Sequence, residues 1–219
     1  MKSFRRFTAG LAFGWILAPL GLTATEAAAL RAALPPGMED CLVEGVDLAI
    51  GWLETRLPEE RTAYAAICGR AHGFLRSALS PEVVTPGTTT TDDVVWWLRQ
   101  TVHDAGLGSW FQPTVTVQRA TEPPRTGFAA TPSPVTIDPG DLVHIDFGIV
   151  DAGLHTDQQQ HAYVLREGES SAPQGLEQGL RLGNRLQDIL MDELKVGRTG
   201  NEVLAEALRR AVAEGLRPT

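Results

Sequence analysis

Two aspartates that lie eleven residues apart, Asp146 and Asp157, are the side chains in this sequence best suited to binding a metal ion. Asp146 lies in segment 142–150, where apolar and polar residues alternate as in a β-strand with one buried face. This alternation places Asp146 on the more polar face. A turn signal at 151–153 precedes a second extended segment, 154–165, so the sequence predicts a β-hairpin.

The loop of this hairpin determines which residues face one another. A two-residue loop at 151–152 would place Asp146 opposite Asp157, on one face of the hairpin. Two carboxylates in this arrangement, with Cβ atoms about 4.5–5.5 Å apart, destabilise the hairpin unless something neutralises them. Carboxylate oxygens suit manganese, magnesium, cobalt or zinc ions, and shared carboxylates can hold two ions about 3.5–4 Å apart. The alternative is a pair of polar strand residues that face water.

Two histidines, His144 and His155, share the carboxylate face in this register, where they lie opposite Gln159 and Gly148 respectively. Imidazole can move protons or support a metal ligand. Both histidines are therefore candidates for a second shell around the metal. The alternative is that each is an ordinary strand histidine with one hydrogen bond.

The hairpin resembles the first half of the metal site in pita-bread metallopeptidases, a family that includes methionine aminopeptidase, Xaa-Pro aminopeptidase, prolidase and creatinase. The resemblance rests on the HIDFG strand, the short glycine turn and the second aspartate, and on the segments TPGTTTTDDVVWWLRQ, GDLVHIDFG and GRTGNEV. It extends from about Leu57 to the end of the chain.

This resemblance implies the α/β (α+β) pita-bread fold, in which helices pack on an antiparallel sheet. It also implies that Asp146 and Asp157 are metal ligands, that the cofactor is a pair of divalent ions such as manganese, cobalt or zinc, and that the substrate is a peptide or a proline-containing dipeptide.

The sequence departs from this family in two respects. The family's later metal ligands, one His and two Glu, have no counterpart after Asp157, and Phe128 and Ala129 occupy the positions where the family places a substrate-side histidine. The expectation is therefore a catalytic domain truncated at its C-terminus, with weak or absent metal binding and impaired activity as a Xaa-Pro aminopeptidase or dipeptidase. No catalytic residue is assigned. The alternative is a non-catalytic peptide-binding module of the same fold.

A short helix is expected at 46–56, and two longer helices follow it before the hairpin. Pro58 suits the first position of a long helix, and Thr90-x-x-Asp93 has the capping-box pattern that begins a second helix, which Gly106 ends. A strand at 113–119 follows. The apolar stripes of the two helices are Ile67, Ala71, Phe74, Leu75 and Ala78, and Val94, Val95, Leu98 and Val102.

Two further helices are expected after the hairpin, and they repeat the first pair. The second capping box, Thr199-x-x-Glu202, lies 109 residues after the first, and Gly215 lies 109 residues after Gly106. Such self-similarity predicts two related units of paired helices and strands, of which the second lacks its strands. The helix that begins at Pro173 aligns Leu176, Leu180, Gly183, Leu186 and Leu190 on one face.

Residues 1–24 have the layout of a secretory signal, with basic residues before an apolar run and small residues after it. This layout predicts a secreted or periplasmic protein. The alternatives are a cytoplasmic protein and a folded segment that begins with the capping box Thr23-x-x-Glu26. Residues 25–56 are assigned to a linker or to the remnant of an N-terminal domain, and residues 57–219 to a partial catalytic domain.

The acidic balance of the chain narrows the range of partners. The net charge of −8 at pH 7 and the pI near 5.1 argue against nucleic acid and anionic membranes as partners.

The 219 residues suffice for one domain with a core, and a homodimer is a candidate assembly. The chain has only two cysteines, Cys41 and Cys68, which is too few for a disulfide framework. A single disulfide between them is possible if the chain is exported. The alternative is that both are buried thiols.

Overall fold

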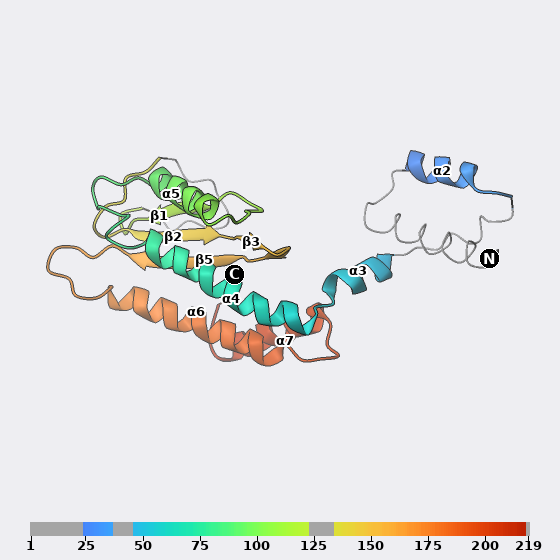
Figure 1. Cartoon of the computed structure of the whole chain (residues 1–219). Helices are drawn as coiled ribbons and strands as arrows, with labels where there is room; N and C mark the ends of the chain where they lie inside the picture. Colours follow the sequence, from blue (N-terminus) through green and yellow to red (C-terminus); the bar gives the residue numbers. More distant parts are fainter. Residues whose placement is uncertain (1–23, 37–45, 123–133, 218–219) are drawn as a thin grey trace. The chain divides into compact units, whose positions relative to one another are not determined.

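The computed structural model describes residues 24–36, 46–122 and 134–217 (Figure 1). The chain divides into two compact units, residues 1–66 and 67–219. No helix within the described ranges combines the length and the apolar character that a membrane crossing needs.

The described part of the first unit is helical. Helix α2 covers Ala24–Ala33, α3 covers Val46–Glu54, and α4, Pro58–Ala78, begins in this unit. Residues 1–23 lie outside the described residues, so the signal-like segment and the capping role of Thr23 stay predictions. Cys41 also lies outside them, and Cys68 is a free, half-buried thiol.

A three-stranded antiparallel sheet is the framework of the second unit. Its strand order is β1-β2-β5, with β1 at Thr114–Gln118, β2 at Leu142–Phe147 and β5 at Gln158–Tyr163. The hairpin continues past β2 into a separate two-stranded ladder, β3 at Val150–Asp151 and β4 at Leu154–His155. The two strands expected for the hairpin are therefore each broken in two. The remaining helices are α5, α6 and α7, at Thr91–Asp104, Gln174–Glu193 and Gly200–Ala213.

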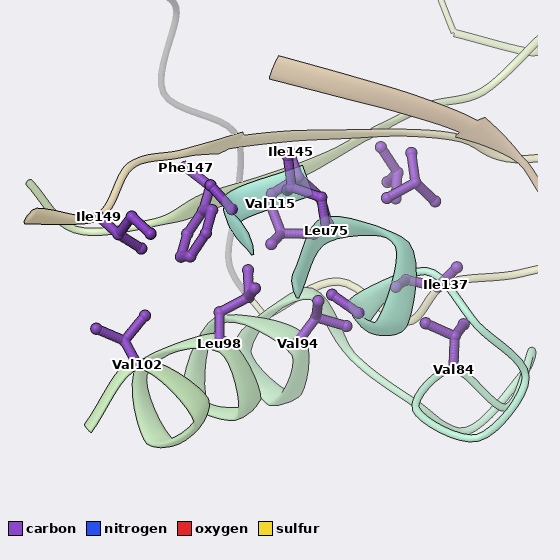
Figure 2. Packing of buried hydrophobic residues seen from close by; sticks show 14 of the residues in the cluster. Leu75, Val84, Val94, Leu98, Val102, Val115, Ile137, Ile145, Phe147 and Ile149 are labelled. Atoms are coloured by element: carbon purple, nitrogen blue, oxygen red, sulfur yellow. The ribbon is translucent and has the colours of Figure 1, made fainter. Parts of the chain in front are cut away.

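The apolar face of β2 forms the centre of the core. Val143, Ile145 and Phe147 are at most 1 % exposed, and side chains of α5 point toward this strand and its continuation (Figure 2). Fully burying a side chain of this size contributes about 1.5–3 kcal/mol. The stripes predicted for the first two helices are confirmed, because the following residues of α4 and α5 are buried in the same cluster: Ile67, Ala71, Leu75, Ala78, Val94, Leu98 and Val102.

The two predicted capping boxes that lie within the described residues are present. Thr90 caps α5 and Thr199 caps α7, each in reciprocal hydrogen bonds with the acidic residue three positions later. Helix α6 packs on α7 through a small cluster around Ile189. The stripe expected on α6 is largely exposed, however, with Leu180 62 % and Leu190 40 % accessible to solvent.

A buried ion pair anchors the start of β2. Asp141 is 3 % exposed and accepts a hydrogen bond from Arg119 Nε at 2.9 Å, just beyond the end of β1. The same guanidinium also donates to the Thr136 carbonyl and to Asp138. Because all of these partners precede β2, the contacts fix where the strand begins relative to β1.

A close approach of the backbone produces the break between β2 and β3. Thr156 is buried and forms two hydrogen bonds with the backbone of Ile149, one through its amide and one through Oγ1. Its carbonyl accepts a hydrogen bond from Trp110 Nε1 at 2.8 Å. A Cβ atom at Gly148 would lie 2.1 Å from that carbonyl oxygen. Only glycine fits at position 148.

We expect Gly148→Ala to lower the free energy of unfolding by about 1–3 kcal/mol, as overpacking typically does. Thr156 cannot move away without straining the hydrogen bonds of its amide and Oγ1 to Ile149 and the hydrogen bond of its carbonyl to Trp110. Urea denaturation measures the change. The control is Gly179→Ala on α6, where an added Cβ meets no atom within 4 Å and helix propensity favours alanine by about 0.5–1 kcal/mol. Equal effects of the two substitutions would contradict the close approach.

Candidate metal centre

Asp146 lies in β2 on the face of the sheet opposite the core, and its cross-strand partner differs from the prediction. It pairs with Gln159 of β5, not with Asp157. The loop of the hairpin is Ala152-Gly153, with φ of 50° and 75°, not 151–152. Both positions of such a tight loop require positive φ, which glycine adopts without strain. The position of Gly153 therefore sets the register.

In the observed register the two aspartates still lie on one face of the hairpin. Moving the loop by one residue shifts the pairing by two residues, and side chains in a strand alternate with period two. Asp157 directly precedes β5 and lies two residues before Gln159. The aspartates are thus diagonal neighbours and not a directly opposed pair.

The surroundings of Asp146 disfavour its negative charge. Burial raises the pKa of the Asp146 carboxyl above its ordinary value, and the negative charge of Asp157 raises it further. Asp146 Oδ1 is buried and has no hydrogen-bond partner, while Oδ2 accepts a 3.4 Å hydrogen bond from Gln159 Nε2. A cation at this point would satisfy the free oxygen and neutralise the pair.

The predicted second-shell histidines lie in different places along the hairpin. His144 pairs with His161, not with Gln159, although its Nε2 lies 3.1 Å from Gln159 Oε1. His155 pairs with Val150, not with Gly148, and its ring packs edge-on against Trp110 at 5.9 Å between centroids. One side chain, Gln159, therefore links His144 to Asp146. A second-shell role for either histidine stays a prediction.

Gln159 and His161 are the site residues that sequence reasoning missed. Gln159 lies directly opposite Asp146, and His161 lies directly opposite His144. Gly153 was the signal in the sequence, because pairing the strands across a loop at Ala152-Gly153 gives these partners. Partial desolvation of the ring and the nearby positive charge of His144 lower the pKa of His161 below its ordinary value, although the side chain as a whole is exposed. Both residues also line a cavity of about 660 Å³ between β5 and α6.

The two carboxylates fit part of a metal site. Their oxygens suit hard or borderline divalent cations, and the unpartnered Oδ1 of Asp146 is a free ligand atom. Within the described ranges, no group of three or more His, Cys, Asp or Glu side chains is placed to hold a metal ion. Phe128 and Ala129, which occupy the positions of the family's substrate-side histidine, lie outside these ranges.

Comparisons with known proteins agree with the fold. The sequence model of metallopeptidase family M24 matches residues 61–218. The solved structure of a putative aminopeptidase P from Bacillus anthracis is similar over 100 % of this chain, with a TM-score of 0.54 and 13 % sequence identity. This chain spans 53 % of the length of that protein. No curated protein matches the sequence.

We expect Asp146→Asn to raise the free energy of unfolding in metal-free buffer at pH 7. The amide removes a charge that burial and Asp157 both disfavour, and cross-strand pair effects amount to about 0.2–1 kcal/mol. Denaturation in the presence of a chelator measures the change. Asp151→Asn is the control in the same hairpin, because the Asp151 carboxylate pairs with Arg70 at 2.9 Å, and it should leave stability unchanged or lower it. A stability loss in Asp146→Asn would show that this carboxylate is structural.

Proposed function

Because this chain belongs to metallopeptidase family M24, we propose that Asp146 and Asp157 contribute to a divalent metal centre for peptide hydrolysis. Membership agrees with the resemblance to pita-bread metallopeptidases, and the mixed helix and antiparallel-sheet fold is that of the family. The observation that carries the proposal is the buried, unpartnered Oδ1 of Asp146 beside a second carboxylate.

Each residue of the proposed centre has a distinct task. Asp146 offers a ligand atom that is already held by the rigid strand β2, while the exposed Asp157 offers a carboxylate from the solvent side. Gln159 holds the other oxygen of Asp146 in place. A manganese, cobalt or zinc ion bound there would polarise the carbonyl of a peptide substrate and lower the pKa of a water molecule.

We propose a peptide substrate with proline in second position, that is, Xaa-Pro peptidase chemistry. The support is the name of the similar solved protein, an aminopeptidase P. We further propose that the 219-residue chain by itself turns over little substrate, because its described residues offer two adjacent carboxylates but no larger ligand group.

Manganese binding tests the ligand assignment directly. Isothermal titration of the full chain with Mn²⁺ should show weak binding that Asp146→Asn and Asp157→Asn each reduce by about tenfold or more, since even an outer partner of a metal ligand typically contributes about 10–100-fold. Asp151→Asn should bind Mn²⁺ as the unchanged chain does. Equal affinities in all four proteins would overturn the assignment.

Cleavage of a proline-containing dipeptide tests the activity of the chain. With saturating Mn²⁺ or Co²⁺, we expect hydrolysis at most slightly above the rate without enzyme. Chromatography of the released amino acids measures it. Strong metal-dependent cleavage, abolished in Asp157→Asn, would contradict the proposal that this chain lacks part of the centre, while supporting the reaction class.

A non-catalytic peptide-binding module is the second candidate. The lack of a larger ligand group among the described residues favours it. Binding of a proline-containing peptide that is unchanged by a chelator and by Asp146→Asn would support this function over a metallopeptidase.

A further inference from the structure

Two histidines lie side by side on the face of the sheet that the core leaves free. His144 of β2 is the direct cross-strand partner of His161 of β5, and their ring centroids are 4.6 Å apart. His161 is exposed and His144 is half-buried. Neither side chain belongs to the apolar core. Cross-strand partners are held at a nearly fixed separation by the ladder, so this pair of imidazoles is positioned before any ligand arrives.

We propose that His144 and His161 form a second cation site, separate from the aspartate pair, for a divalent transition-metal ion that prefers imidazole. Zn²⁺, Ni²⁺ and Cu²⁺ belong to this class, whereas Mn²⁺ prefers carboxylate oxygens. The proposal rests on the pairing of β2 with β5 and does not depend on the hydrolase function proposed above.

The hydrogen bonds of Gln159 define the ligand atom of His144. The Asp146 carboxylate can only accept, so the amide nitrogen of Gln159 faces it and the amide oxygen faces His144. In the tautomer in which His144 Nε2 donates to that oxygen, Nδ1 keeps its lone pair and can bind a metal ion. A histidine that binds metal commonly donates its other ring N–H to an oxygen in this way.

The same amide separates the two sites. Gln159 stands opposite Asp146, and the next pair on the same face of the sheet is His144 with His161. The aspartate centre and the histidine pair are thus adjacent, yet each has its own ligand type. Because imidazole and carboxylate ligands favour different ions, the two sites should differ in the metal that they prefer as well as in their affinity.

Titration of the full chain, without a histidine tag, with Ni²⁺ tests the site. His161→Ala and His144→Ala should each weaken Ni²⁺ binding by about tenfold or more. Asp157→Asn should retain Ni²⁺ binding, because no hydrogen bond of the histidine pair involves Asp157. His103→Ala, which removes an exposed histidine near the end of α5, is the matched control and should bind like the unchanged chain.

Electron paramagnetic resonance of bound Cu²⁺ gives a second measurement that reports the ligands themselves. Coupling to two imidazole nitrogens is expected in the unchanged chain and to one in His161→Ala, and thermal melts establish that each variant is folded. Ni²⁺ binding that survives in both histidine variants would overturn the site. So would a loss in Asp157→Asn as large as in His161→Ala, because the ligands would then form one mixed centre. Failure of the Mn²⁺ experiment alone would refute only the aspartate centre.

Discussion

The burial of one face of β2 is the constraint on which the candidate centre depends. Side chains alternate along a strand, so the packing of Val143, Ile145 and Phe147 against α4 and α5 directs His144 and Asp146 to the other face. A slip of one residue would bury the two polar side chains and expose the apolar ones. The core thus determines which side chains of β2 lie on the face that is open to a ligand.

The surroundings of Asp146 are unfavourable for stability, and the proposed metal centre would explain them. The half-buried carboxylate of this residue faces a second negative charge and leaves one oxygen without a partner, which a protein selected for stability alone would avoid. Glycine at position 148 and buried Thr156 bend the hairpin next to this residue. The rigid surroundings keep the disfavoured carboxylate in place, so that a bound cation, and not a rearrangement of the chain, would relieve the repulsion.

Gln159 connects the two proposed cation sites through one amide group. Its nitrogen donates to Asp146 Oδ2 at 3.4 Å, and its oxygen lies 3.1 Å from His144 Nε2. With the amide in this orientation, the tautomer of His144 that donates from Nε2 to Gln159 has Nδ1 free for a ligand. A residue without charge can in this way influence the ligand atoms of its neighbours on the same sheet face.

The sequence by itself determined the features that depend on local periodicity and local hydrogen bonds. These are the capping boxes at Thr90 and Thr199, the buried stripes of α4 and α5, and the face of β2 on which Asp146 lies. The motifs around Asp146 also indicated the metallopeptidase family.

Only the tertiary structure decided the register of the hairpin, and with it the pairing of Asp146 with Gln159 and of His144 with His161. The alternating pattern is identical for two registers that differ by two residues, so it could not choose between them. The backbone at Ala152-Gly153 made that choice, because the positive φ angles of a tight loop centre it on the glycine.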